Sequence, residues 1–258
     1  STDNTVTINA AASDTIAPSV AVTAPASGST LSGTVTVSAN ASDNVGVAGV
    51  QFLVDGANLG AEDTASPYSI SWNTTTATNG THTLAARARD AAGNSTTTTA
   101  ITIIVDNQAP IGTLVINVGA AATNSRNVTL TLSATDALSG VTQMRFSNTG
   151  TSFSAAEAYA PTKAWTLTTG AGTKTVYVQF KDAVGNWSTA AITDTIVLDT
   201  TAPTITARTA TNITNSSATI TWTTSEAATS QVNFGLTKSY GSTTTLNPIL
   251  LLSHSVTL

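Results

Sequence analysis

The residues Asp106-Asn107-Gln108-Ala109-Pro110 stand near the middle of the chain, and their pattern occurs three times. Asp-x-x-Ala-Pro also begins at Asp14 and at Asp199, so its prolines are 92 and 93 residues apart. A second pattern, Asp-Ala-x-Gly-Asn, begins at Asp90 and Asp182, which are again 92 residues apart. Such a period is longer than the roughly 20–50 residues of a solenoid repeat. It has the size of a two-sheet sandwich of about 100 residues.

Within each repeat, short runs of β-branched residues alternate with turn residues. Val35, Val37 and Ala39 alternate with Thr and Ser at period 2, which is typical of a half-buried strand. The expected strands are 19–23, 33–39, 50–54, 68–72, 82–88 and 97–105 in the first repeat, and 113–118, 128–134, 142–146, 164–167, 175–180 and 192–198 in the second. No stretch shows the apolar period of an amphipathic helix. The sequence therefore predicts an all-β chain of tandem Greek-key β-sandwiches.

The composition argues against several classes of function. The chain has 9 Lys and Arg, spread singly, and a formal net charge of −5, so we expect no nucleic acid as a partner. Cysteine is absent, which excludes disulfides, thiolate zinc sites and cysteine nucleophiles. The longest run of large aliphatic residues, 249–252, has 4 residues. A membrane span needs about 18, so we expect no membrane insertion.

The Asp-x-x-Ala-Pro start, the Asp-Ala-x-Gly-Asn close and the strands between them resemble bacterial Ig-like domains over residues 14–199. The segment after Ala202 resembles a fibronectin type III domain instead, with Trp222 at the place of a core tryptophan in its second strand. We therefore expect immunoglobulin-like modules at 14–106 and 107–199, and a partial fibronectin type III-like module at 200–258. Residues 1–13 are interpreted as an orphan strand of a preceding module or as a donor strand.

This resemblance implies an extracellular or cell-surface protein of bacterial type. We expect a non-catalytic structural protein that acts as a stalk, an adhesin or a filament subunit. The alternative is a carbohydrate- or surface-binding appendage of a secreted bacterial hydrolase. Glycans and host or cell-surface proteins are the partners that these functions imply.

The ends of the sequence suggest a further partner, which is another copy of the chain. The segment 200–258 lacks the last two strands of a complete module, whereas 5–8 has the character of an isolated last strand. One interpretation is a window cut from a longer array. The other is head-to-tail self-association, in which 5–8 of one copy adds to the open module of the next and builds a homopolymer. One donated strand would replace only one of the two that are missing.

The acidic residues follow the same period as the repeat. In an immunoglobulin-type sandwich the start of the module, the loop after the second strand and the last hairpin loop lie at one pole. This rule groups eight of the 14 acidic residues by module, as Asp14, Asp43 and Asp90, as Asp106, Asp136 and Asp182, and as Asp199 with Glu226. Calcium takes 6–8 oxygen ligands, so these poles are candidate calcium sites that would stiffen the joints. The alternative is that each Asp accepts N–H groups of its own turn.

Patterns for catalysis are missing from the sequence. Neither His82 nor His254 has acids and serines clustered around it in sequence, and metalloprotease and nucleophile-elbow motifs are absent. Trp72 and Trp165 occupy matching positions in the two repeats and are expected to pack inside. Trp187 follows a Gly-Asn turn and is the best candidate for an exposed, sugar-binding aromatic side chain.

Overall fold

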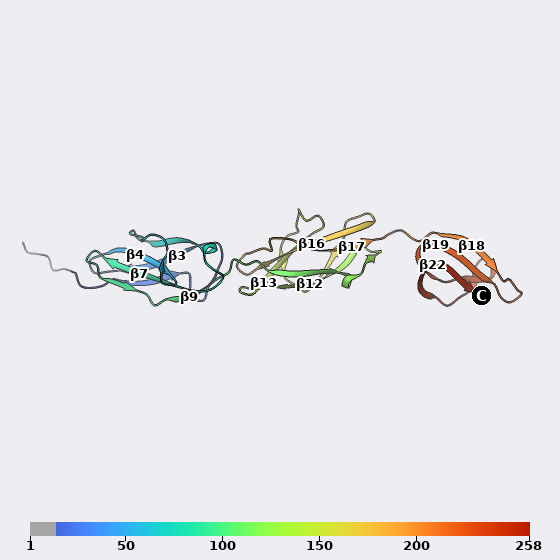
Figure 1. The fold of residues 1–258 in the computed structure, drawn as a ribbon, viewed down its shortest axis with the longest axis horizontal. Helices are drawn as coiled ribbons and strands as arrows, with labels where there is room; N and C mark the ends of the chain where they lie inside the picture. The colour runs from blue at the N-terminus through green and yellow to red at the C-terminus, as the bar shows by residue number, and fades with distance from the viewer. Residues whose placement is uncertain (1–13) are drawn as a thin grey trace, which may run out of the picture. The chain divides into compact units, whose positions relative to one another are not determined.

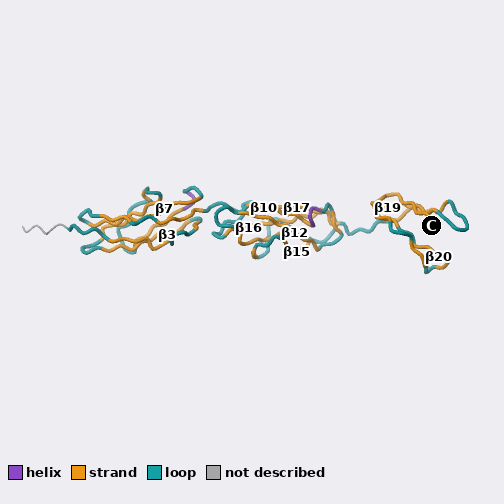
Figure 2. The backbone as a smooth tube through the Cα atoms, turned by 90° about the horizontal axis from the view of Figure 1, so that it is seen from below, coloured by secondary structure: helices purple, strands orange, loops and turns teal. Residues whose placement is uncertain are grey.

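The computed structural model describes residues 14–258, and most of them lie in strands and tight turns (Figure 2). In this part of the chain the only helical segments are the 3-10 turns η1 (Thr74–Thr76) and η2 (Asn117–Gly119). None of its helices is therefore long and apolar enough to cross a membrane. The all-β prediction is confirmed. The segment 1–13, with its predicted strand at 5–8, lies outside the described residues.

The chain divides into two units, 14–169 with 173–197 and 170–172 with 198–258. The larger unit contains two sandwiches. In the first, one sheet has the strand order β1-β3-β6, with β1 (Ser19–Ala24), β3 (Thr34–Ser42) and β6 (Tyr68–Asn73). The other has the order β2-β9-β7-β4-β5, with β2 (Thr30–Leu31), β9 (Ile101–Val105), β7 (Gly80–Asp90), β4 (Val47–Val54) and β5 (Ala57–Asn58). The short β8 (Ser95–Thr97) pairs with β7.

The second sandwich repeats this order, and Figure 1 labels its main strands. Its smaller sheet is β10-β12-β15, with β10 (Ile111–Ile116), β12 (Asn127–Thr135) and β15 (Thr162–Thr166). Its larger sheet is β11-β17-β16-β13-β14, with β11 (Ala122–Thr123), β17 (Ile192–Leu198), β16 (Gly172–Asp182), β13 (Val141–Ser147) and β14 (Glu157–Ala158). Because β3 and β4, like β12 and β13, follow each other in different sheets, the topology is the predicted Greek key.

Each sandwich has its own apolar core between its two sheets. Phe52 and Leu84 are fully buried in the first core, and Phe146 and Phe180 lie in the second. Burying a side chain of this kind stabilises the fold by about 1.5–3 kcal/mol. Trp72 is 3% exposed, and Trp165 packs against Phe146 with ring centroids 5.4 Å apart. The expected packing role of both tryptophans is therefore confirmed.

Some strand boundaries differ from the prediction. The expected strand 97–105 is divided between β8 and β9, and the expected strand 113–118 ends at Ile116. It ends because Asn117 and Val118 adopt positive φ angles of 46° and 57°. The Oδ1 atom of Asn117 then accepts the N–H of Thr129 at 2.9 Å, which fixes this bend. A β-branched valine in this region is unusual, so the apolar character of Val118 gave a wrong boundary.

The C-terminal unit has the sheet order β18-β19-β22, with β18 (Ile205–Thr211), β19 (Thr219–Ser230) and β22 (Asn247–Thr257). A separate hairpin pairs β20 (Asn233–Thr237) with β21 (Tyr240–Thr243). Trp222 is 8% exposed, and its indole stacks on His254 with ring centroids 4.9 Å apart. In contrast, Ile249 and Leu250 on β22 are 61% and 64% exposed. This unit therefore buries little apolar surface within residues 200–258.

Candidate metal centres

Three aspartates meet at the pole of the second sandwich that the linker enters. Asp106 follows β9, Asp136 follows β12 and Asp182 ends β16. One carboxylate oxygen of each lies within 4.8 Å of one oxygen of each of the other two. Asp106 and Asp182 are 0% and 1% exposed, and Asp136 is half-buried. The structure thus brings together the three residues that the sequence grouped at this pole.

These carboxylates also serve as turn caps. Asp182 Oδ1 accepts the backbone N–H groups of Gly185 and Asn186 at 2.6 and 2.7 Å. Asp136 Oδ1 accepts the N–H of Ser139 at 2.9 Å, together with two neighbouring N–H groups of its turn. Burial alone would raise the pKa of Asp136, but these N–H groups outweigh it and hold that pKa below its usual value. Asp136 is therefore ionised at neutral pH.

The cap interactions leave a carboxylate oxygen of Asp106 without a partner. Its Oδ1 accepts the N–H of Gln108 at 3.0 Å, whereas its Oδ2 is buried and has no hydrogen-bond donor among residues 14–258. A buried oxygen of this kind costs free energy unless a donor or a cation satisfies it. The two interpretations of these aspartates are thus compatible, because one oxygen can cap a turn while the other faces a cation.

The pole of the first sandwich has the same arrangement. Carboxylate oxygens of Asp14, Asp43 and Asp90 lie within 4.8 Å of one another. Asp14 Oδ2 and Asp43 Oδ1 are buried, and neither has a donor in the part of the chain that is described. Asp90 accepts the backbone and side-chain N–H groups of Asn94 at 2.8 and 2.7 Å. Burial raises the pKa of Asp90, but the donors of its turn, led by Asn94, outweigh it and lower that pKa below its usual value.

The third predicted group is a pair rather than a cluster. Burial and then the neighbouring Asp199 carboxylate raise the pKa of Glu226, so the structure places these two acids next to each other. Within residues 14–258 no third acidic residue, histidine or cysteine joins them. Two half-buried carboxylates that repel each other offer a cation fewer ligands than either aspartate cluster.

Asn186 connects the second cluster to the linker and to the first sandwich. Its Nδ2 donates to Asp182 Oδ2 at 2.6 Å and to the backbone oxygen of Asp106 at 3.0 Å. Its Oδ1 accepts the hydroxyl of Ser32 at 2.8 Å. No role was expected for Asn186, although its counterpart Asn94 occupies the same place in the repeated motif and donates to the backbone oxygen of Asp14 at 3.0 Å.

The linker residue Asn107 is bound to the first sandwich as well. Its Oδ1 accepts the N–H of Gly33 at 2.9 Å, and its own N–H donates to Asn79 Oδ1 at 2.8 Å. Its Nδ2 donates to the backbone oxygen of Thr74 at 3.2 Å. Asn107 therefore holds the linker, next to Asp106, against the first sandwich.

The two histidines have side-chain partners that are distant in sequence. His82 Nδ1 lies 2.6 Å from Asp55 Oδ2. His254 Nδ1 lies 2.6 Å from the hydroxyl of Ser230, and its Nε2 lies 2.9 Å from that of Thr224. Ser230 and His254 are only 1% and 2% exposed, so this serine hydroxyl is packed away from any substrate. These contacts join residues 24–30 positions apart and leave no local sequence pattern.

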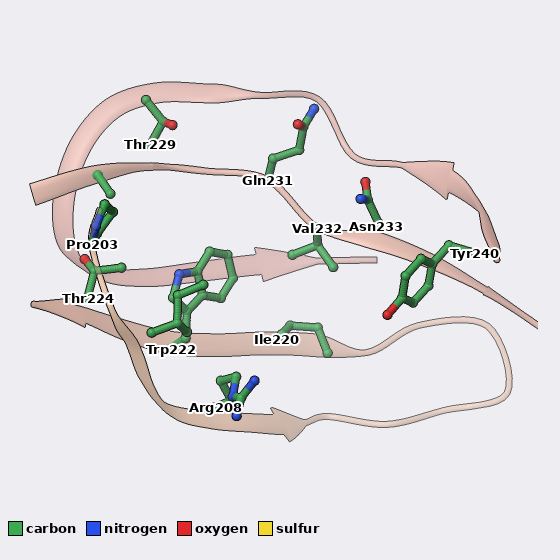
Figure 3. A pocket seen from close by; sticks show the side chains of 12 residues that line it. Pro203, Arg208, Ile220, Trp222, Thr224, Thr229, Gln231, Val232, Asn233 and Tyr240 are labelled. Atoms are coloured by element: carbon green, nitrogen blue, oxygen red, sulfur yellow. The ribbon is translucent and has the colours of Figure 1, made fainter. Parts of the chain in front are cut away.

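A cavity of about 570 Å³ opens in the C-terminal unit. Figure 3 shows the Trp222 indole inside it, with Ile220 and Val232 nearby and Tyr240 at one end. Arg208 is the one charged residue of its lining, which includes no acid and no histidine. The cavity is thus the uncovered inner face of β19 rather than a site with groups for acid–base chemistry.

Comparison with known proteins finds two family models that match part of this architecture. The family described as "Bacterial Ig domain" matches residues 18–86, and the one described as "Bacterial Ig-like domain (group 3)" matches residues 66–152. No curated protein matches the chain.

Solved structures that match the chain include the fibronectin(III)-like modules of Clostridium thermocellum CbhA, at 19% identity and a TM-score of 0.40, covering 70% of this chain and 93% of that one. A tetra-tandem repeat from the extending region of a large adhesion protein has 21% identity and a TM-score of 0.33, covering 93% of this chain and 65% of that one. The D00-D0 domain of intimin has 13% identity and a TM-score of 0.32, covering 70% and 99%. Two families of bacterial Ig-like domains thus match residues 18–152 between them, in agreement with the resemblance that the repeat indicated.

Proposed function

We propose that this chain is a non-catalytic stalk segment of a bacterial surface or secreted protein, in which calcium stiffens the joint between the two sandwiches. Bacterial Ig-like domains are typical of extracellular structural and adhesion proteins, which supports the general role. The observation that carries the proposal is the buried, partnerless Oδ2 of the linker residue Asp106, within a cluster that includes Asp136 and Asp182.

The chemistry of this cluster fits a hard divalent cation. Its three side chains are all carboxylates, and oxygen is the ligand that calcium prefers. Loop carbonyls and water would complete the 6–8 ligands that calcium takes. Magnesium is a poorer match, because it demands near-octahedral geometry and retains several of its waters. Zinc prefers histidine and cysteine ligands, which this cluster lacks.

An ion at this place would act on the joint because its ligands come from different segments. Asp106 belongs to the linker, whereas Asp136 follows β12 and Asp182 ends β16, both in the second sandwich. The linker is already restricted by Pro110, whose ring fixes φ, and by the hydrogen bonds of Asn107 to Gly33 and Asn79. A bound cation would tie this segment to the second sandwich and so limit bending between the two.

Thermal unfolding of the full chain in calcium and in chelator tests this proposal. An ion at 100 times its Kd stabilises the native state by about 2.7 kcal/mol, which corresponds to a rise in Tm on the order of 5 °C or more for a protein of this size. We expect this rise in the wild type and a smaller one in Asp106→Asn. The asparagine keeps the oxygen that accepts the Gln108 N–H and removes the charge.

The matched control is Asp194→Asn in the same sandwich. The Oδ2 of Asp194 accepts the N–H of Ile116 at 2.8 Å, and it belongs to neither aspartate cluster. This variant should keep the full calcium response, whatever its own Tm. The absence of any rise in the wild type would contradict the proposal, and so would an equal rise in Asp106→Asn.

A further inference from the structure

A positively charged cluster lies on the larger sheet of the second sandwich. The Cζ atom of Arg145 on β13 is 4.2 Å from the ring centroid of Trp187 and 5.1 Å from that of Phe153. The Nε of Arg145 donates to Gln179 Oε1 at 2.9 Å. Together these contacts fix the guanidinium plane. We call Arg145, Trp187 and the neighbouring Lys181 the arginine platform; all three side chains are half-buried.

The platform has no negative partner in the described part of the chain. Neither Arg145 nor Lys181 has a carboxylate oxygen within 4.0 Å among residues 14–258. Lys181 Nζ lies 5.7 Å from the Trp187 centroid, so both cations are close to one ring. Lys163 in the same sandwich, in contrast, pairs with Glu157 at 2.6 Å.

The first sandwich carries different residues at the positions equivalent to the arginine platform. In the matching register, Gln51 occupies the position of Arg145, since Gln51 pairs with Arg87 as Arg145 pairs with Gln179. The amide nitrogen of Gln51 donates to the backbone oxygen of Phe52 at 2.9 Å, and the side chain is 5% exposed. This counterpart is therefore neutral, and the segment 59–60 covers it, because its amide nitrogen also lies 3.3 Å from the backbone oxygens of Leu59 and Gly60.

The other two members of the platform are also changed in the first sandwich. Ser95 follows the Gly-Asn turn where Trp187 follows it in the second. Arg89 takes the place of Lys181 and is neutralised by two hydrogen bonds to Glu62, at 2.7 and 2.8 Å. The first sandwich therefore forms without two unpaired cations at the positions of Arg145 and Lys181, so the fold itself does not require them.

We propose that the arginine platform binds the carboxylate groups of an acidic polysaccharide. The Nε of Arg145 is occupied by Gln179, whereas its Nη atoms make no hydrogen bond within residues 14–258. A guanidinium held in this way presents a planar pair of donors that matches a carboxylate. Lys181 adds a second charge, and the aromatic rim offers an apolar contact for the C–H groups of a sugar.

The same geometry argues against a neutral sugar as the occupant. Stacking of a neutral sugar requires an open aromatic face, but the guanidinium of Arg145 already lies 4.2 Å from the Trp187 ring. A folded protein partner would bury about 800 Å² on each side, far more than three side chains offer. The carboxylate of an acidic sugar, in contrast, can accept hydrogen bonds from the two Nη atoms of Arg145.

An NMR titration of the full chain with trigalacturonate tests this inference. EGTA in the buffer removes calcium, so the result does not depend on the proposed metal site. We expect shifts of the Trp187 indole and Arg145 Nε–H signals that weaken as salt is raised, because the contact is ionic and partly exposed. Arg145→Gln should weaken binding about tenfold or more, since a charge-assisted bidentate contact is lost.

Two further variants make the test specific. Arg145→Lys keeps the charge without the planar donor pair, so it should bind with intermediate affinity. Lys174→Gln removes a cation whose Nζ donates to the backbone oxygen of Thr169 at 2.9 Å, away from the platform, and should bind like the wild type. The melting temperature of each variant establishes that it is folded.

Several results would overturn the inference. They are the absence of shifts at the platform, equal binding of neutral galactotriose, and equal binding of triglutamate, which would indicate an acidic peptide site. An equal loss in Lys174→Gln would also overturn it, because the attraction would then be a property of net charge rather than of Arg145.

Discussion

The hydroxyl of Ser32 in the first sandwich donates a hydrogen bond of 2.8 Å to Asn186 Oδ1 in the second. Asn186 also donates to the backbone oxygen of Asp106, so one side chain contacts both sandwiches and the linker between them. A hydrogen bond of this type contributes about 0.5–1.5 kcal/mol on its own. Because this hydrogen bond lies beside the aspartate cluster, the restraint that it places on the linker adds to the restraint from a bound cation.

Replacing Asn186 with Ala should loosen this joint. The variant loses the donors to Asp106 and Asp182 and the acceptor of Ser32, and buried partners left unsatisfied cost about 1–3 kcal/mol. Residual dipolar couplings should show the two sandwiches reorienting independently. The matched control is Asn94→Ala, which removes the equivalent side-chain donors to Asp14 and Asp90 in the first sandwich and should leave the joint unchanged. Equal effects of both variants on the joint would contradict this role.

The pair of His82 and Asp55 predicts a dependence of stability on pH. The hydrogen bond to Asp55, followed by that to the Thr78 carbonyl, raises the pKa of His82. The stabilisation is therefore complete below the unfolded pKa of about 6.5 and is lost as pH rises through the higher folded value. Because the Asp55 side chain is 52% exposed, we expect an effect below about 1 kcal/mol.

Urea unfolding at pH 6 and at pH 8.5 measures this effect. The wild type should lose more stability over this interval than His82→Gln, which lacks the imidazole that pairs with Asp55. The hydrogen bond from the Thr83 N–H, followed by that with His82, lowers the pKa of Asp55. The contribution of the Asp55 carboxylate to stability is therefore lost only as pH falls through this lowered folded pKa. Parallel pH profiles of the two proteins would show that the pair contributes nothing.

The buried hydroxyl of Ser230 should be important for the C-terminal unit. Thr224 donates its hydrogen to the backbone oxygen of Glu226 at 2.6 Å, so His254 Nε2–H donates to Thr224 and Ser230 donates to His254 Nδ1. Ser230→Ala leaves that nitrogen unsatisfied, at a cost of about 1–3 kcal/mol. Hydrogen exchange of the β22 amides should accelerate accordingly.

A control for this prediction lies on the outer face of β19, the strand that also carries Ser230. The hydroxyl of Thr221 meets that of the exposed Thr209 at 2.6 Å. Thr221→Ala should change stability by about 0.5 kcal/mol or less, as surface substitutions usually do. If Ser230→Ala were as mild, the buried network would not stabilise this unit.

The edge strand β22 should promote self-association at high concentration. Ile249, Leu250 and Leu252 are 61%, 64% and 57% exposed, and β22 is the last strand of its sheet. Exposed apolar edges are templates for pairing with other chains. The triple change to Thr should reduce association in sedimentation velocity, whereas Leu236→Thr, at an exposed position on β20, should not. Equal association of the triple variant and the wild type would exclude this edge as its cause.

Much of the fold follows from the repeat. Because two motifs shared one period, the loops that begin and end each sandwich could be assigned to one pole, and Asp106, Asp136 and Asp182 do meet there. The alternation of Val37 and Ala39 with hydroxyl residues gave the buried face of β3 correctly. These features are local or periodic, which is why a single sequence reveals them.

Contacts between distant residues could not be predicted in this way. Arg145 and Trp187 are 42 positions apart, and nothing in either segment indicates that the guanidinium covers the ring. Trp187 was expected to be an exposed sugar platform, but it is half-buried beside that guanidinium. The short β2 was also missed, because its parallel pairing with β9 depends on the crossing of the chain from one sheet to the other.

Calorimetric titration of the chelator-treated full chain with calcium tests the central claim most directly. The two aspartate clusters predict two bound ions per wild-type chain and one per chain of Asp106→Asn. The absence of binding heat in the wild type, or an unchanged number of ions in the variant, would contradict a calcium-stiffened joint.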